Sequence, residues 1–284
     1  MKRAVLLLAL AAVWLVTSAS AQTLRTLSST RQLHGETSLI VDVTYAVGEL
    51  HLEPAAPGDL YRMELKYDED KFAPVREYDA DAGVLRLGLR SLHGHVSLRG
   101  GHNDETPSLD IALTPDVPLT LRLEVGAAEA NVEFGGLELR RLAYKTGASE
   151  SHVRFSRPNP VDCDALTFEV AAAEFTATGL GNANCRRMGF HGGIGEVTLD
   201  FGGDWRNSAD ATVKVGIGSV KLLLPRDLGV AITLNRFLAS FDHSGFTRRG
   251  GVYYSDNYGS ARYQLNLTVD ATFGGIEVQW MDAR

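Results

Sequence analysis

The stretch from Val213 to Leu224 reads VKVGIGSVKLLL, and its pattern recurs along most of the chain. Each copy has an apolar, polar, apolar run, then a pivot of small residues, then a second run of the same kind. The clear copies are FHGGIGEVTLDF (Phe190 to Phe201), FEVAAAEFTAT (Phe168 to Thr178), YKTGASESHVRF (Tyr144 to Phe155) and LEVGAAEANVEF (Leu123 to Phe134). Weaker copies are LNRFLASFDH (Leu234 to His243), VDATFGGIEVQW (Val269 to Trp280) and, well apart from the rest, VTYAVGELHLE (Val43 to Glu53).

The spacing of these copies decides the expected fold. They recur roughly every 20 to 24 residues, and a fixed period of this size indicates stacked structural repeats. In each copy the apolar residues sit on alternate positions, as in strands, and no segment has helical apolar spacing over more than two turns. The sequence predicts an all-β fold: a parallel β-solenoid forming one elongated domain, with strands of about four to six residues and corners of glycine or alanine.

The first 21 residues have the features of a secretory signal peptide. Lys2 and Arg3 precede an apolar run from Ala4 to Val16, and the small-residue pattern ASA follows at positions 19–21. The run is too short to span a bilayer, and no later stretch approaches the length that spanning needs. We therefore expect an exported protein without a transmembrane segment, periplasmic or extracellular. It would begin at Gln22, and since no cysteine follows the cleavage point we expect no lipid anchor.

The net charge of the chain disfavours some classes of binding partner. The whole chain carries a formal charge of −7, and loss of the two basic residues of the leader would change it to −9. An acidic exported protein is a poor candidate for binding nucleic acid or anionic lipid.

Four segments are expected along the chain: a leader at 1–21, a polar, partly ordered lead-in at 22–36, an N-terminal β-rich part at 37–118, and repeats with a C-terminal cap at 119–284. Within the third segment, strands are predicted at Ser38 to Tyr45, Met63 to Tyr67 and Val84 to Leu89. DEDKFAP and DADAG form the turn material between the last two strands.

The two cysteines, Cys163 and Cys185, occupy the same position in consecutive repeats, each three residues before an apolar strand start. Adjacent parallel strands lie about 4.8 Å apart, which brings the two residues within the Cα separation that a disulfide needs. A disulfide and a pair of stacked free thiols are both compatible with this spacing. A metal site is disfavoured, because no second pair of ligands shares the spacing.

The stretch from Leu119 to Pro225 resembles the toast-rack domain of exported bacterial proteins. The resemblance rests on the ordered series of phrases from LEVGAAEANVEFGGLELRRLAYKTGASESHVRF to VKVGIGSVKLLLP, and the earlier LKYDEDKFAPVREYDADAGVLRLGL is similar to the N-terminal part of that domain. The family is similar to adhesin-like β-solenoids and to the soluble part of LiaF-type cell-wall stress regulators. The resemblance implies a fold and an envelope location, and it brings no catalytic activity or cofactor.

Several residue groups are candidates for chemistry. His93, His95 and His102 are the densest potential metal ligands, although the glycines around them also suit a loop with solvated histidines. Stacking would align the pivot glutamates Glu49, Glu129, Glu150, Glu174 and Glu196 in a column, which we expect to be solvated rather than a binding site. The GGIG and VGIG phrases lack the lysine and the helix of a phosphate loop. No catalytic set is complete.

An aromatic and basic group near the C-terminus is the candidate binding surface. Its members are Phe246, Arg248, Arg249, Tyr253, Tyr254, Tyr258 and Arg262, with Tyr263 beside them. Tyrosine faces with arginine donors suit a sugar ring or a protein partner, and the alternative is a cap over the last repeat.

The sequence thus predicts a non-enzymatic envelope protein that binds a partner protein or a cell-wall glycan. Two alternatives stay open: a polysaccharide lyase or hydrolase on a β-helix, and a purely structural spacer.

Overall fold

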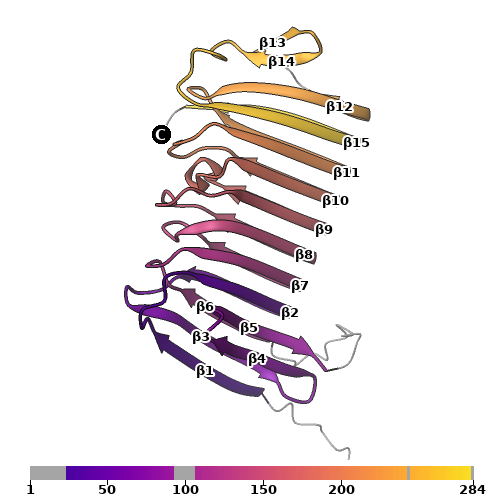
Figure 1. Ribbon diagram of the computed structural model, residues 1–284. Coiled ribbons are helices and arrows are strands. Elements are labelled where there is room, and N and C mark those ends of the chain that lie inside the picture. The colour runs from indigo at the N-terminus through magenta and orange to yellow at the C-terminus, as the bar shows by residue number, and fades with distance from the viewer. Residues whose placement is uncertain (1–23, 93–105, 242–243, 283–284) are drawn as a thin grey trace, which may run out of the picture.

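The computed structural model describes residues 24–92, 106–241 and 244–282. In these ranges the regular structure is almost entirely strand, with one short 3₁₀ helix, η1 (Leu180–Ala183). The strands are β1 (Leu24–Gln32), β2 (Leu39–Pro54), β3 (Asp59–Asp68), β4 (Phe72–Asp79), β5 (Val84–Ser91), β6 (Ser108–Leu113), β7 (Leu119–Glu133), β8 (Leu139–Arg154), β9 (Ala165–Thr178), β10 (Arg187–Asp200), β11 (Ala209–Pro225), β12 (Gly229–Phe241), β13 (Phe246–Arg249), β14 (Val252–Ser255) and β15 (Gln264–Met281). The prediction of an all-β fold is confirmed (Figure 1).

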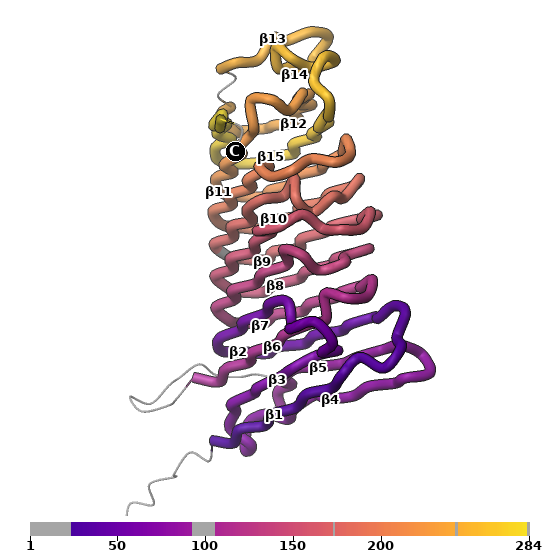
Figure 2. The backbone as a smooth tube through the Cα atoms, turned by 90° about the vertical axis from the view of Figure 1, so that its left-hand side faces the viewer, coloured from indigo at the N-terminus to yellow at the C-terminus, as the bar shows by residue number. Residues whose placement is uncertain are grey.

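The long strands lie side by side in the order β2, β7, β8, β9, β10, β11, β15, β12, and every neighbouring pair is parallel. Their register aligns equivalent positions of the recurring phrase: Val213 of β11 pairs with Phe190 of β10 on one side and with Val269 of β15 on the other. Figure 2 shows the turns between the strands repeating above one another along the stack.

The expected strand length was wrong. The long strands run 13 to 18 residues, because each continues through its pivot instead of ending there. Gly218 shows how the pivot is passed: its φ is 142°, and a Cβ at this position would lie 1.8 Å from the carbonyl oxygen of Gly195 on the neighbouring strand. Only glycine permits this approach with a positive φ, so the strand bends without losing its pairing.

The core is a single cluster of apolar side chains that runs the length of the stack. On β11, for example, Val213, Val215, Val220, Leu222 and Leu224 are all buried. Each such residue contributes roughly 1.5 to 3 kcal/mol when fully buried, and it can be buried only when both neighbouring strands are present.

The N-terminal end differs from expectation in three places. The lead-in contains β1, which pairs antiparallel with β3. Apolar and polar residues alternate only weakly in β1, because the strand lies at the sheet edge and none of its residues is buried. Phe72 to Pro74, expected as turn, begin β4, which forms an antiparallel hairpin with β5. The isolated copy of the phrase lies in β2 and pairs directly with β7, since the intervening strands form a side excursion.

The C-terminal end departs from chain order. β15 lies between β11 and β12, so the strand that comes latest in the described chain is not at the end of the stack. The hairpin of β13 and β14 then pairs antiparallel with β12, over Ala231 to Thr233 only. Figure 1 shows this hairpin at the top of the stack.

Candidate functional site

The bend in the long strands presents exposed side chains along one corner of the molecule. On β11, Val215 is buried, Ile217 and Ser219 are exposed, and Val220 is buried again. Strict alternation would place Val215, Ile217 and Ser219 on one side of the strand, but the glycines between them turn the backbone. Because neighbouring strands are in register, each exposed corner position forms a column along the stack.

In the N-terminal half of the corner, this column is acidic. Glu49, Glu129, Glu150, Glu174 and Glu196 are paired strand to strand and all exposed; we call them the acidic column. Successive members are separated by one strand spacing, about 4.8 Å. Among the described residues, no lysine or arginine lies within ion-pairing distance of these glutamates. Oε1 of Glu150 lies 3.2 Å from Nε2 of His152, which carries a charge only when it is protonated.

In the C-terminal half, the exposed corner position two residues earlier is large and apolar. Ile194, Ile217, Phe273 and Leu238 pair in register on β10, β11, β15 and β12. Their exposed fractions are 58%, 51%, 43% and 64%, and the adjacent Phe237, 75% exposed, packs edge-on against Phe273 with ring centroids 6.2 Å apart. We call these five residues the apolar ridge. The equivalent positions on β7, β8 and β9 are alanines 127, 148 and 172.

A hollow of about 630 Å³ lies beside the ridge. It begins two residues after the ridge position on each strand. This position is glutamate in the acidic column, and on β11, β15 and β12 it is Ser219, Gly275 and Ser240. Glu196 and Glu277 line it with Lys221, whose Nζ lies 3.9 Å from the Glu277 carboxylate. Small side chains at the corner therefore open a hollow of mixed polar and apolar lining, with carboxylates among its lining residues.

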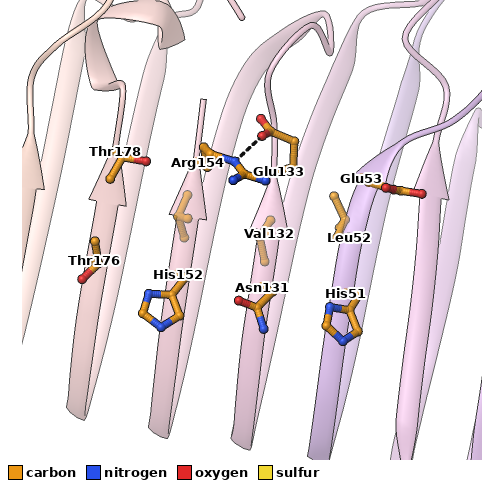
Figure 3. A pocket seen from close by; sticks show the side chains of 11 residues that line it. His51, Leu52, Glu53, Asn131, Val132, Glu133, His152, Arg154, Thr176 and Thr178 are labelled. Atoms are coloured by element: carbon orange, nitrogen blue, oxygen red, sulfur yellow. Dashed lines mark hydrogen bonds and ion pairs between the residues drawn. The ribbon is translucent and has the colours of Figure 1, made fainter. Parts of the chain in front are cut away.

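A second, smaller hollow of about 310 Å³ lies on the N-terminal half, across β2, β7, β8 and β9. Figure 3 shows His51, Asn131, His152 and Thr176 in one row on successive strands, with Arg154 and Glu133 above them. The row offers imidazole, amide and hydroxyl groups, which can form hydrogen bonds with a polar ligand.

Glu133 is held firmly at the edge of this hollow. Its carboxylate accepts hydrogen bonds from the backbone N–H groups of Gly135 (2.6 Å) and Ser156 (3.0 Å) and from Arg154 Nε (2.6 Å). Burial acts to raise the pKa of Glu133, but these donors stabilise the charged form and together hold the pKa below its ordinary value. Glu133 thus fixes the turns after β7 and β8 and is not available for chemistry.

The predicted aromatic and basic group is divided by the structure. Tyr253 is buried and packs against Phe241, with ring centroids 5.1 Å apart, and Phe246 packs against Trp280 at 5.0 Å. These two cover the end of the stack.

The other members lie further out. Arg248, Arg249 and Arg262 are exposed, whereas Tyr254 and Tyr258 pack together at 5.0 Å and are half-buried. The guanidinium of Arg248 lies over the Tyr253 ring, and that of Arg262 lies over Tyr263.

Cys163 and Cys185 are disulfide-bonded and buried, with Cα atoms 4.2 Å apart. They form an isolated parallel bridge just before β9 and β10, so equivalent positions of two consecutive repeats are joined covalently. The bond lies between the last strand with an alanine at the ridge position and the first with an isoleucine.

The histidine group cannot be placed: His93, His95 and His102 lie outside the described residues. Within the described ranges, no cluster of three or more histidine, cysteine or acidic residues could hold a metal ion. The same ranges contain no helix with the length and hydropathy needed to cross a membrane.

The chain matches the family described as the N-terminal domain of toast_rack, DUF2154, over residues 19–165 and 160–223. It belongs to this family. The match covers the excursion at the N-terminal end and the stack as far as β11, so the acidic column and the start of the ridge both lie within the toast-rack domain.

Solved structures are similar to this toast-rack protein at low sequence identity. A "putative cell adhesion protein" from Clostridium sporogenes is 17% identical, with 91% of this chain and 100% of that chain covered and a TM-score of 0.48. A "putative adhesin" from Bacteroides fragilis is 12% identical (90% and 98% covered, TM-score 0.35). Another from Parabacteroides merdae is 11% identical (92% and 92%, TM-score 0.37). None of the curated proteins matches the chain.

The apolar ridge is the feature that sequence reasoning missed. The phrases GGIG and VGIG indicate corners, and the alternation of apolar residues does not show whether their isoleucines face the core or the solvent. The sequence does contain a signal at the ridge position. Three repeats have alanine there, and the later repeats have isoleucine, phenylalanine or leucine. A large apolar residue at a position that needs only a small one indicates a role outside the core.

Proposed function

We propose that this toast-rack protein is an exported, non-enzymatic component of the bacterial cell envelope, a β-solenoid scaffold that binds a partner protein or a wall glycan. The observation that carries the proposal is the corner, where register stacks exposed side chains of one kind into continuous columns. A surface of this kind can contact an elongated partner along much of its length. Family membership supports an envelope role, and the leader-like residues 1–21 support export.

The alternative of a carbohydrate-active enzyme is less well supported. Glycoside hydrolysis needs two carboxyl groups in different environments, one of them held as an acid. The glutamates of the acidic column are instead equivalent, exposed and evenly spaced along the strands. Such a column suits contact with a cationic partner better than acid and base catalysis.

The outer arginines and tyrosines near the C-terminus form a second proposed contact area. Arg248, Arg249 and Arg262 accompany the pair Tyr254 and Tyr258. A guanidinium beside an aromatic ring can contact either a sugar or a protein side chain.

Export and binding can be tested in one preparation. The full-length gene is expressed in a bacterial host, the envelope is fractionated, and the N-terminal residue of the product is determined by mass spectrometry; we expect Gln22. A photo-crosslinking residue is then placed at position 150 or 217 on the corner, and at position 64 on β3 as a control. We expect crosslinked protein or glycan at the corner positions only.

Two results would contradict the proposal. One is retention of the unprocessed chain in the cytoplasm. The other is turnover of an envelope polysaccharide by the purified protein, with activity lost when a single glutamate of the acidic column is changed to glutamine.

A further inference from the structure

We infer that the corner binds an amphipathic, cationic helix of a partner protein, with the helix lying along the stack and its apolar stripe on the ridge. This inference rests on the proposed function and names the chemistry of the partner. Three observations lead to it: the exposed ridge, its spacing, and the charge that continues from it.

The ridge is too apolar and too continuous to be an ordinary surface. Ile194, Ile217, Phe273 and Leu238 are the same corner position on four neighbouring strands, and with Phe237 they make up five of the six large apolar side chains that are exposed in the described ranges. Soluble proteins seldom gather such residues in one contiguous patch without a binding role. Since alanine occupies the equivalent position on β7 to β9, the corner itself does not require a large residue.

The spacing of the ridge suits a helix. Neighbouring strands are about 4.8 Å apart, so four ridge positions cover about three spacings of that size. Side chains three or four residues apart on one face of a helix are about 5 to 6 Å apart, so a series such as i, i+4, i+7 and i+11 repeats at nearly the strand spacing. A helix that runs across the strands therefore places one apolar residue against each ridge residue over about three turns.

Charge selects a basic helix. The hollow beside the ridge is lined by two glutamates, Glu196 and Glu277, and by one lysine. Glu196 is also the member of the acidic column that lies nearest the ridge. Glu174 follows on the next strand, also without a lysine or arginine partner among the described residues. A helix with lysine or arginine beside its apolar stripe would be attracted here, and an acidic one would be repelled.

Other occupants fit less well. A second copy of this chain supplies no helix from its described residues beyond the single 3₁₀ turn. An anionic membrane would be repelled by the acidic column and by the net charge of −7. Both remain measurable outcomes.

The test uses a defined probe with the purified full-length exported protein. The probe is a fluorescein-labelled helical peptide of leucine and lysine, with leucine at i, i+4, i+7 and i+11; its control has glutamate in place of every lysine. We expect saturable one-to-one binding of the lysine peptide in fluorescence anisotropy, weakened by added salt, and no binding of the glutamate peptide. A photo-reactive leucine in the peptide should crosslink to β10, β11, β15 or β12.

Variants separate the two parts of the site. Ile217→Ser with Phe273→Ser should weaken binding by about tenfold or more, since central apolar contacts dominate such interfaces. Glu174→Gln with Glu196→Gln should weaken it by about threefold and reduce its salt dependence. Leu92→Ser, which removes an exposed apolar residue outside the ridge, and Glu64→Gln on β3 are the matched controls and should leave binding unchanged. All variants should melt at the parent temperature or slightly above it.

Four results would overturn the inference: equal binding of the two peptides, binding that is insensitive to the ridge variant, a dimer in light scattering that is lost in the ridge variant, or ridge-dependent sedimentation with anionic vesicles of phosphatidylcholine and phosphatidylglycerol. Failure here leaves the proposed function standing if the corner still crosslinks an envelope protein or glycan. If the protein is not exported, the proposed function fails whatever the peptide does.

Discussion

The two halves of the corner share one strand register and differ in nearly every exposed side chain. β9 and β11 bury equivalent valines, Val170 and Val215, and in both strands the alternation of buried and exposed residues breaks just after them. Outside, β9 has Ala172 and Glu174 where β11 has Ile217 and Ser219. The inward positions must repeat because each one packs against the same position of its neighbours, whereas the outward positions touch solvent and are free to differ. The exposed side chains that differ between repeats therefore determine what each part of the corner can bind.

The largest expected effect tests whether the buried sides of the two halves contribute equally to stability. Val132→Asp on β7 and Val220→Asp on β11 each bury an unpaired charge, and each should destabilise the protein by about 4 kcal/mol or more. Circular dichroism melts would show loss of the cooperative transition in both variants. Ser219→Asp, on the exposed side of β11, is the control and should melt near the parent temperature. A normal melt for only one of the valine variants would mean that the halves are built differently inside.

The next effect concerns the bend. Gly218→Ala would place a Cβ 1.8 Å from the Gly195 oxygen at a φ of 142°, and we expect a loss of about 2 to 4 kcal/mol from strain and broken pairing. Gly189→Ala on β10 is the matched control, because no atom lies closer than 3.7 Å to the new Cβ. Equal melting of the two variants would show that the bend on β11 tolerates a side chain.

The disulfide joins the halves where their chemistry changes. Reduction of Cys163–Cys185, which are 22 residues apart in sequence, should lower the free energy of unfolding by about 3 kcal/mol through the larger entropy of the unfolded chain. Denaturant titrations with and without reductant measure this. The double variant Cys163→Ala, Cys185→Ala should be insensitive to reductant, and an unchanged parent midpoint in reductant would remove any stabilising role from the bond.

A smaller effect concerns Glu133, at the end of β7. Burial opposes its ionisation, but its three donors prevail and depress the pKa, so the stability it contributes is present above the ordinary glutamate pKa and is lost as pH falls through the lowered pKa. Glu133→Gln should cost about 1 to 2 kcal/mol at pH 7, and the cost should disappear in strongly acidic solution. Denaturant titrations across pH would show it. A cost that persists at acid pH would indicate lost packing in place of lost charge.

The smallest effect tests repulsion within the acidic column. Glu174→Gln should raise stability at low salt by a few tenths of a kcal/mol, since like charges on adjacent strands destabilise a sheet, and the gain should fall as salt is added. Denaturant titrations at two salt concentrations measure the difference. Ser219→Gln, at the equivalent position of the apolar half, should show no salt dependence.

The sequence predicted those features of the fold that follow from the spacing of the repeats. The period of the phrases was enough to align Val213 with Phe190, to bring Cys163 beside Cys185 and to stack the pivot glutamates. It could not show that β15 precedes β12 in the stack, because LNRFLASF and VDATFGGIEVQW are both weak copies of the same phrase and differ in nothing that sets their order. β1 was missed because an edge strand without buried residues leaves little alternation to detect.

The candidate site was harder to predict than the fold. The sequence left two roles open for Tyr253 and Phe246, a binding surface and a cap over the last repeat, and both pack inward at the end of the stack. Ile217 and Phe273 are large and apolar, a residue type that is usually buried, yet they are exposed. In both cases residue type indicates a preference for burial, while the local bend or hairpin decides which side of the backbone faces solvent.

The position of β15 has a consequence for the order in which the protein is made. β12 leaves the ribosome before β15, yet β15 is its pairing partner over most of its length. β11 likewise lacks its second neighbour until β15 has been synthesised. A chain that stops before Gln264 would carry two open strand edges beside exposed apolar side chains, which favours aggregation and degradation. The stack is therefore complete only in chains that have been translated through β15.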